Sequence, residues 1–288
     1  MRTWLFVINP ISGDRDKSYV SSTILGWAKS NHQKVDFWNT TGEDDLGKLQ
    51  QYLQDHTPEA VIAVGGDGTV LLCAHAVKDT EIALGLLPEG SANGMAAELG
   101  IPQDLDEALA ILLKGKTLSA DMLCFNDQEY GLHISDVGLN ARLVKDFEEG
   151  DQRGLLGYAR GVVSNIVQTN PFKVTLELDD EEVTEEAYMV AFGNATKYGT
   201  GAKLSPNGTI DDGKFEVYVL REINLAGIAG QFFGVFEDDA AYYKVYQVKE
   251  ARIHLAEAQP FQIDGELKEP TREVSVKIIP GCLRLIAS

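Results

Sequence analysis

The feature that most constrains this chain is a short apolar stretch that runs into a glycine-rich turn. Residues 61–64 are all apolar and predict a buried strand, which stops at Gly65 and Gly66. Residues 69–77 then predict a helix. A strand that breaks on glycines and continues as a helix directs backbone N–H groups and the helix dipole at one point, so the pattern indicates phosphate binding. Asp67 in the same turn favours a Mg²⁺ ion or a substrate hydroxyl beside that phosphate.

Glycine suits such a turn for two reasons. It has no Cβ to block the close approach of a phosphate, and it adopts positive φ angles easily. The sequence Gly-Gly-Asp-Gly also occurs in ordinary structural turns, so the stretch taken alone fits either interpretation.

The charge of the chain excludes several classes of partner. The chain has 288 residues and a formal net charge of −19. Nucleic-acid binding depends on neutralising phosphates with basic side chains, so we expect no nucleic acid among the partners. Electrostatic attachment to anionic lipid is disfavoured for the same reason. Any contact with a membrane should therefore be local, apolar and transient.

No membrane-spanning or secretory segment is expected. No apolar run approaches the roughly 18 residues of a transmembrane helix, and the run at residues 4–8 is too short for a signal peptide. Cys73, Cys124 and Cys282 are far apart, which fits reduced thiols rather than a disulfide framework or a zinc site. We therefore expect a cytoplasmic protein. The sequence does not decide between a monomer and a homodimer.

Strands and helices alternate over the first half of the chain. The apolar pattern predicts strands at 3–8, 34–38, 61–64 and 82–87, and helices at 14–30, 42–56, 69–77, 94–99 and 104–113. Such alternation predicts a parallel sheet covered on both faces, that is, a doubly wound α/β domain. Each loop of unusual composition follows the carboxyl end of a strand, where open α/β sheets bind ligands.

The pattern changes near residue 121. Beyond it, alternating or β-branched runs predict strands at 125–132, 133–144, 172–178, 183–192, 215–220, 242–248, 251–255 and 273–279, with helices at 155–168 and 225–236. We therefore expect an antiparallel β-sandwich after the α/β domain. The two domains should span residues 1–121 and 122–288.

Five motifs stand in order along the chain. They are Asn9-Pro10-Ile11-Ser12-Gly13, Gly65-Gly66-Asp67-Gly68-Thr69, Pro88-Glu89-Gly90-Ser91-Ala92-Asn93, Ile210-Asp211-Asp212-Gly213-Lys214 and Ile263-Asp264-Gly265-Glu266. In this order they resemble the diacylglycerol kinase catalytic family, and especially its bacterial soluble lipid kinases of the YegS and DgkB type. Sphingosine and ceramide kinases are more distant members. The resemblance covers nearly the whole chain.

The resemblance implies a two-domain lipid kinase that uses ATP and Mg²⁺. The α/β domain would bind ATP, the β-sandwich would bind a lipid substrate at the membrane interface, and the reaction would occur in the cleft between them. Asp67 would orient the phosphates through magnesium-bound water, and Glu266 falls on the family's proposed catalytic base. The positions that hold ATP in the family correspond here to Asn9, Thr40, Gly65, Gly66, Asp67, Gly68, Thr69, Ser91 and Asn93. The metal positions correspond to Asp212, the backbone oxygens of Thr209 and Lys214, and Asp121 as an acidic member of a Mg²⁺ network.

Several of these residues also have a plain structural interpretation. Glu266 could be a solvated turn carboxylate, although its place after a glycine also lets it reach a hydroxyl. Asp212 could cap a type I′ hairpin turn. Ser91 could be the N-cap of the helix after it. Thr40 could be an ordinary loop hydroxyl, and Thr41 beside it makes the register of this motif ambiguous.

The chain departs from the family pattern at two places. The family's Asn-Asp is here Asn93-Gly94, so one acidic side chain of the metal network is missing. The family's Gly-x-Asp-Ala is here residues 138–141, with Asn140 in place of the carboxylate. These departures leave open a non-catalytic lipid-binding or regulatory protein of the same fold. An NAD kinase-like enzyme is a second alternative, but the Asn-Pro-x-Ser-Gly and Asp-Gly-Glu motifs favour a lipid kinase. The lipid itself, diacylglycerol or a sphingoid or other lipid alcohol, is not identified.

Overall fold

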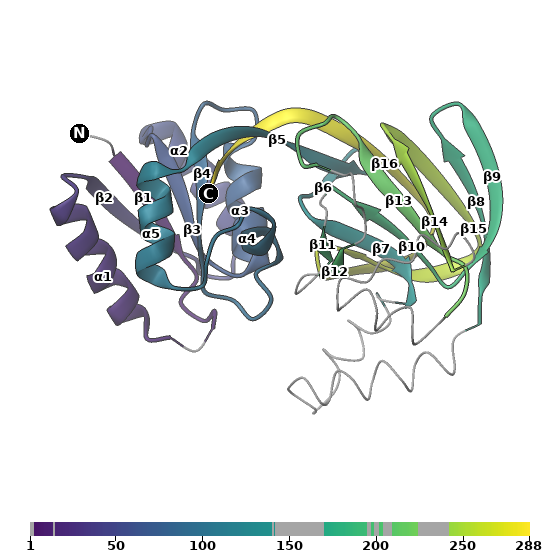
Figure 1. Ribbon diagram of the computed structural model, residues 1–288, viewed down its shortest axis with the longest axis horizontal. Coiled ribbons are helices and arrows are strands. Elements are labelled where there is room, and N and C mark those ends of the chain that lie inside the picture. Colours follow the sequence, from purple (N-terminus) through teal and green to yellow (C-terminus); the bar gives the residue numbers. More distant parts are fainter. Residues whose placement is uncertain are drawn as a thin grey trace. The chain divides into compact units, whose positions relative to one another are not determined.

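The chain folds into two units in the computed structural model (Figure 1). The structure describes residues 3–13, 15–139, 141, 170–194, 197–198, 202–203, 209–223 and 242–288, with the backbone alone for 197–198 and 202–203. Among these, unit 1 takes in the chain up to Met122 together with Pro280–Ser288, and unit 2 lies within Leu123–Ile279. Asn140 and the helices expected at 155–168 and 225–236 fall outside the described residues.

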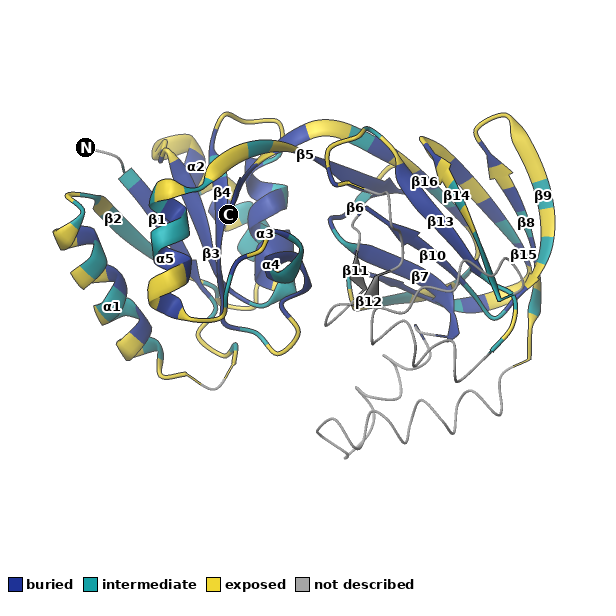
Figure 2. Ribbon diagram, viewed as in Figure 1, coloured by how far each residue is buried: buried dark blue, intermediate teal, exposed yellow. Residues whose placement is uncertain are grey.

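A parallel sheet forms the centre of unit 1. Its strands lie in the order β2-β1-β3-β4-β16. They are β1 (Thr3–Ile8), β2 (Lys34–Asn39), β3 (Ala60–Gly65), β4 (Ala83–Pro88) and the C-terminal part of β16 (Glu266–Ala287). Strands β1, β3 and β4 are buried almost throughout (Figure 2). Continuous apolar runs of this kind are what a parallel sheet covered on both faces requires.

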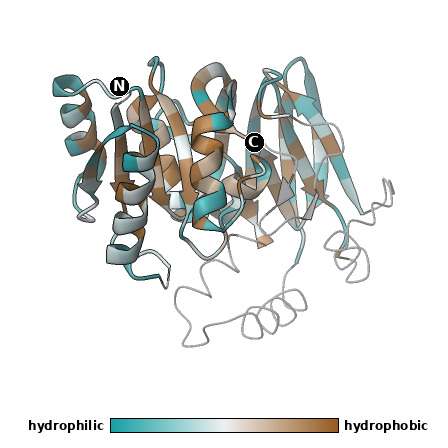
Figure 3. Cartoon of the chain, turned by 60° about the vertical axis from the view of Figure 1, so that its left-hand side comes forward, coloured by the Kyte–Doolittle hydropathy of each residue, from teal (hydrophilic) through white to brown (hydrophobic). Residues whose placement is uncertain are grey.

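Helices cover both faces of this sheet. They are α1 (Lys17–Ser30), α2 (Asp45–Asp55), α3 (Asp67–Val77), α4 (Gly94–Glu98) and α5 (Leu105–Lys114). Because β1 lies between β2 and β3, the connections β1-α1-β2 and β3-α3-β4 run in opposite directions, and right-handed crossovers then place α1 and α3 on opposite faces. In agreement, α1 contacts α5 and α2 contacts α3. Figure 3 shows the hydrophobic residues gathered on the strands. The predicted doubly wound α/β fold is confirmed.

Three helices begin two or three residues from the predicted positions, and one of them, α2, begins at Asp45 and not at residue 42. α1 begins at Lys17 and not at residue 14, because the carboxylate of Asp16 caps the helix by accepting from the N–H of Ser18 at 2.9 Å. α3 begins at Asp67 and not at residue 69, with Gly66 as its N-cap. Asp67 therefore lies in the first turn of a helix, where the helix dipole favours a carboxylate.

Unit 2 consists of antiparallel strands in two layers. Its strands are β5 (Lys116–Phe125, which begins in unit 1), β6 (Glu129–Gly131), β7 (Ile134–Gly138), β8 (Phe172–Leu178), β9 (Glu181–Ala187), β10 (Met189–Gly193), β11 (Lys197–Tyr198), β12 (Ala202–Lys203), β13 (Phe215–Leu220), β14 (Tyr243–Val248), β15 (Glu250–Ile263) and the first part of β16. One layer has the order β14-β13-β10-β7-β15, and the other has β9-β8-β15-β16-β5-β6, while β11 and β12 form a separate two-stranded sheet. β15 belongs to both, because residues 251–255 pair with β8 whereas Phe261 and Gln262 pair with β7. This is the predicted β-sandwich, which is confirmed.

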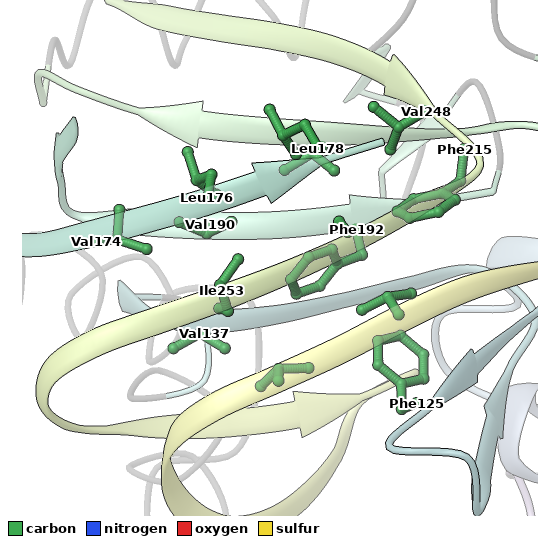
Figure 4. Close-up of a cluster of buried hydrophobic side chains, with 14 of the residues drawn as sticks. Phe125, Val137, Val174, Leu176, Leu178, Val190, Phe192, Phe215, Val248 and Ile253 are labelled. Atoms are coloured by element: carbon green, nitrogen blue, oxygen red, sulfur yellow. The ribbon is translucent and has the colours of Figure 1, made fainter. Parts of the chain in front are cut away.

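The apolar core of unit 2 is drawn in Figure 4, with Phe125, Phe192 and Phe215 among its largest side chains. Side chains alternate between the two faces of each strand. Val137 of β7 faces this core, so its neighbour Asp136 faces the other side of the layer. That other side is also buried and carries a small second cluster, made of Ile134, Ala191 and Tyr218.

The strand predicted at 125–132 is wrong. β5 ends at Phe125 and β6 begins at Glu129, and between them Asn126 and Asp127 have φ angles of 50° and 58°. Such left-handed backbone breaks a strand into a hairpin. The run predicted at 183–192 likewise divides, into β9 and β10.

Candidate functional site

The glycine motifs meet at the carboxyl edge of the unit 1 sheet. The strand order reverses between β1 and β3, and doubly wound sheets bind ligands at such a point. The N–H of Asn9 donates to the carbonyl of Val64 at 3.1 Å, which joins the first motif to the second. The N–H of Glu89 donates to the carbonyl of Gly65 at 2.9 Å, which joins the third motif to the second. Three of the segments predicted to hold ATP are therefore neighbours.

The glycines of these motifs allow one backbone to touch another. A Cβ on Gly90 would lie 2.4 Å from the Cα of Gly66. A Cβ on Gly13 would lie 2.1 Å from the carbonyl oxygen of Glu89, and Gly13 also has a φ of +59°. Gly66 thus lets two loops pack against each other, and its contact with ATP stays a prediction.

Asp67 holds the start of α4, directly after the third motif. Its carboxylate oxygens accept from the N–H groups of Gly94, at 3.0 Å, and Met95, at 3.2 Å. Helix geometry leaves the first N–H groups of α3 without an intrahelical acceptor. Those of Asp67 and Gly68 have no acceptor among the described residues. Donors of this kind at the start of a helix suit an anion.

Thr40 and Thr41 differ in their surroundings. The N–H of Thr40 donates to the carbonyl of Ile8 at 2.9 Å, so Thr40 lies beside the carboxyl end of β1. The hydroxyl of Thr41 instead donates to the carboxylate of Asp45 at 2.9 Å, next to the start of α2. The geometry therefore favours the register in which Thr40 belongs to the candidate site.

Asn93, and not Ser91, is the N-cap of α4. Its side-chain amide accepts from the N–H of Gly90 at 2.9 Å and donates to the carbonyl of Gly90 at 2.7 Å, so it closes the loop of the third motif. The interpretation of Ser91 as a cap is wrong, and Ser91 is exposed.

The remaining predicted ATP residues shape the other two loops. The side-chain oxygen of Asn9 accepts from the N–H of Ile11 at 3.1 Å, and Ile11 itself is 90% exposed. Thr69 is buried, and a Cβ on Gly65 would lie 2.3 Å from its hydroxyl oxygen. Both residues therefore have a structural task at the edge where the motifs meet.

Sequence reasoning missed a buried glutamate that makes two ion pairs at this edge. The Glu89 side chain is 2% exposed, and its carboxylate lies 2.7 Å from Nη1 of Arg15 and 3.4 Å from Nζ of Lys17. Arg15 also donates to the carbonyl of Gln103 at 2.9 Å. Two positive charges are thus held close to the glycine motifs of a strongly acidic chain. Glutamate is rarely buried, so its residue type gave no signal of this role.

The candidate base lies on a tight hairpin of unit 2. Asp264 and Gly265 have φ angles of 47° and 89°, as in a type I′ turn, and they join Ile263 of β15 to its partner Glu266 of β16. The Glu266 side chain is 59% exposed, and Oε2 lies 3.7 Å from Nζ of Lys268. An exposed carboxylate on a rigid turn can accept a proton from a hydroxyl that reaches it.

Asp212 shapes the turn before β13. One carboxylate oxygen accepts from the N–H of Lys214 at 2.9 Å, and the other accepts from Nε2 of Gln247 at 3.2 Å. Of the two central residues only Gly213 has a positive φ, of +71°, so the turn is not the type I′ hairpin considered from the sequence. Thr209, Asp212 and Lys214 are exposed.

A buried glutamate lies beside this turn. Glu216 is 4% exposed and accepts from Nε2 of Gln247 at 3.3 Å. The pKa of Glu216 is raised to about 7: burial is the largest cause and the negative charge of Asp212 also raises it, whereas the bond from Gln247 lowers it.

Asp121 lies on β5, where it is buried and accepts from the N–H of Gly281 at 2.7 Å. It thereby joins β5 to β16 within unit 1. In the described part of the chain, no three His, Cys, Asp or Glu residues gather in a group that could hold a metal ion. None of the helices described has both the length and the apolar character needed to cross a membrane.

Family models match both parts of the chain. Residues 3–125 match the model described as the diacylglycerol kinase catalytic domain. Residues 134–287 match the model described as the YegS C-terminal NAD kinase beta sandwich-like domain.

Individual relatives agree with the family models. The chain is 29% identical over 238 residues to a protein of Chromohalobacter salexigens named "probable lipid kinase YegS-like", covering 79% of this chain and 75% of that one. It is 29% identical over 256 residues to the "probable lipid kinase YegS" of Salmonella arizonae, covering 83% of each. A crystal structure of a diacylglycerol kinase from Bacillus anthracis has the same fold, with a TM-score of 0.74, 20% identity, and coverage of 100% of this chain and 97% of that one.

Proposed function

The chain belongs to the kinase family in which a diacylglycerol kinase catalytic domain is followed by a YegS-type β-sandwich, and we propose that it transfers the γ-phosphate of ATP to a hydroxyl group of a lipid. The single observation that best supports this proposal is the meeting of three motifs at the carboxyl edge of the unit 1 sheet, where the strand order reverses. The domain division at residue 121 and the transient, apolar contact with a membrane remain parts of the proposal.

We assign the nucleotide to this edge. The N–H groups of Asp67 and Gly68 would donate to phosphate oxygens. Arg15 and Lys17, fixed on Glu89, would add positive charge nearby. Phosphoryl transfer depends on positioning and charge neutralisation more than on covalent help from the protein, which is what these groups can supply.

We assign the lipid hydroxyl to Glu266. In the proposed step the hydroxyl proton passes to the Glu266 carboxylate while the hydroxyl oxygen bonds to the γ-phosphorus. The bond between that phosphorus and the β,γ-bridging oxygen breaks, and ADP leaves with the electron pair. The Glu266 carboxylate is exposed, and its ion pair with Lys268 at 3.7 Å leaves it able to take a proton.

A Mg²⁺ ion would neutralise phosphate charge when bound. Its candidate holders are Asp67 at the nucleotide edge and, in unit 2, Asp212 with the backbone oxygens of Thr209 and Lys214. These all offer oxygen, the donor atom that Mg²⁺ prefers, so the residues fit the ion. Asp121 stays a weaker candidate, since its carboxylate is buried against Gly281.

A kinase assay with γ-labelled ATP tests the proposal against its rivals. The purified chain is offered diacylglycerol, a sphingoid base, ceramide and NAD in separate reactions with Mg²⁺. Label in a lipid product that disappears in the Glu266→Gln variant supports a lipid kinase. Label in NADP supports the NAD kinase alternative. ATP binding without any labelled product would mean that the chain is a non-catalytic member of the family.

A further inference from the structure

Two buried polar side chains lie behind the hairpin that carries Glu266. Asp136 of β7 is 0% exposed and Gln262 of β15 is 2% exposed. They are direct cross-strand partners, on the face turned away from the apolar core. Burying polar groups costs free energy unless they are hydrogen-bonded, so the hydrogen bonds of this pair indicate its structural role.

The pair forms a chain of hydrogen bonds that ends at the hairpin turn. The N–H of Ala141 donates to Oδ1 of Asp136 at 2.8 Å, and Nε2 of Gln262 donates to Oδ2. The other end of the Gln262 amide, Oε1, accepts from the N–H of Gly265 at 2.5 Å. Gly265 directly precedes Glu266.

Donors and acceptors follow a fixed order along this series of hydrogen bonds. Both oxygens of Asp136 accept in these bonds, and the backbone N–H of Gly265 can only donate. The NH₂ end of the Gln262 amide must therefore face Asp136, and its oxygen must face Gly265. Asp136 thus determines the orientation of an amide that in turn holds the turn in place.

A second anchor holds the residue before Gly265. The carboxylate of Asp264 accepts from the N–H groups of Leu132, at 2.5 Å, and His133, at 3.0 Å. The N–H of Asp264 donates to the hydroxyl of Ser135 at 3.3 Å. Both central residues of the turn are fixed from inside unit 2, whereas the Glu266 side chain stays exposed.

We propose that Asp136 and Gln262 are positioning residues: by orienting the Gln262 amide, Asp136 fixes the hairpin and so aims the Glu266 carboxylate. The functional half of this proposal rests on the role proposed for Glu266. Small misplacements of a reacting group cost about 10²-fold in rate, so a loosened hairpin should lower turnover without weakening ATP binding.

Exchanging the carboxylate and the amide between positions 136 and 262 tests the direction of the hydrogen bonds. Asp136→Asn leaves one oxygen for two donors, the N–H of Ala141 and the NH₂ of Gln262; when it stays with Ala141, an NH₂ group faces the NH₂ of Gln262 and the Gln262 amide loses its support. In Gln262→Glu two carboxylates face each other. In the double variant the new amide on β7 donates to the new carboxylate on β15. That carboxylate still accepts from the N–H of Gly265, so every donor again has an acceptor.

We expect each single variant to lower kcat at least about tenfold, with the KM for ATP within about twofold of wild type, since a misplaced base affects the chemical step. The double variant should recover kcat to within about threefold of wild type. In a Glu266→Gln background neither single change should lower kcat further, because the carboxylate to be aimed is gone. Thr184→Val is the matched control. It removes the hydrogen bond between the hydroxyls of Thr175 on β8 and Thr184 on β9, which lie 3.3 Å apart, and it should leave kcat unchanged.

Hydrogen exchange of the Gly265 amide provides a readout that does not depend on activity. Exchange should be faster in each single variant and return to the wild-type rate in the double variant, with circular dichroism confirming that all are folded. Folded single variants with wild-type exchange and kcat, or a folded double variant that recovers neither, would overturn the proposal. If Glu266→Gln keeps its activity while exchange follows the expected order, the proposed base is wrong and the structural assignment of the pair stands.

Discussion

The loops at the unit 1 edge and the hairpin of unit 2 are held by different means. The loops are held mainly by backbone packing, because Gly66 lies against Gly90 and Gly13 against the carbonyl of Glu89. The hairpin is held by side chains, chiefly the amide of Gln262 and the carboxylate of Asp264. Added atoms should therefore disrupt the loops, whereas an altered donor or acceptor should disrupt the hairpin.

Asp67 supports the unit 1 loops through its side chain, as Gln262 and Asp264 support the hairpin, because its carboxylate accepts from the N–H groups of Gly94 and Met95. We expect Asp67→Asn to lower turnover about 10²–10³-fold with the fold intact, because charge beside the phosphates matters more than shape. Asp104→Asn is the matched control. Asp104 also accepts from two backbone N–H groups, those of Asp106 and Glu107 at the start of α5.

Comparing these two variants in kinase assays and thermal melts separates capping from catalysis. The free energy of unfolding of each variant should fall by no more than about 2 kcal/mol through weaker helix capping, and only Asp67→Asn should lose activity. A folded Asp67→Asn variant that keeps more than about a third of wild-type turnover would show that Asp67 is only a cap.

Gly90→Ala tests the backbone packing of the loops. Its Cβ would lie 2.4 Å from the Cα of Gly66, so the loops must separate. We expect a stability loss of about 1–3 kcal/mol and at least about tenfold weaker ATP binding by calorimetry. Gly26→Ala in α1, where a Cβ meets nothing within 4 Å, is the control and should be neutral or stabilising by up to about 1 kcal/mol. Equal behaviour of the two variants would refute the packing role.

Glu216 should make the stability of unit 2 depend on pH. Its pKa is raised to about 7 in the folded chain, chiefly by burial, so its contribution is full below the ordinary value of 4.5 and is lost as the pH rises through about 7. Glu216→Gln should therefore match wild type at pH 5 and exceed it at pH 8, by on the order of 1–3 kcal/mol. Urea unfolding at both values measures this difference, and a constant difference across the range would count against the raised pKa.

The smallest effect concerns salt. A chain with a net charge of −19 gains little from an anionic surface. Binding to lipid vesicles should therefore change by less than about threefold between low and physiological salt, where the Debye length is roughly 8 Å. A collapse of binding over this range would indicate a basic patch. Arg153, Arg160 and the side chains of Lys197 and Lys203, the first candidates, lie outside the described residues.

The sequence predicted the parts of the molecule that depend on local signals. Apolar runs and turn residues identified both fold types, and glycines identified the loops that meet at the sheet edge. The break at Asn126 and Asp127 was missed because neither residue requires a positive φ. Local sequence also cannot show what a side chain meets after folding, so the burial of Glu89 between Arg15 and Lys17 was not predicted.

The support of the hairpin was the least predictable feature. Asp136 and Gln262 lie 126 positions apart, and each has the residue type of an ordinary surface position. Only the pairing of β7 with β15 brings them together. The Asp-Gly-Glu motif therefore identified the candidate base from the sequence, whereas the residues proposed to position it, Asp136 and Gln262, could be found only from the fold.

The kinetics of Glu266→Gln test the central claim most directly, because this change keeps the size of the side chain and removes its ability to take a proton. We predict that kcat falls about 10²–10⁴-fold, that the KM for ATP stays within about twofold, and that raising Mg²⁺ restores nothing. Glu266→Asp, one methylene shorter, should keep partial activity. If high Mg²⁺ restores the Glu266→Gln variant, Glu266 belongs to a metal site, and the base must be sought elsewhere, with Asp67 as the next candidate.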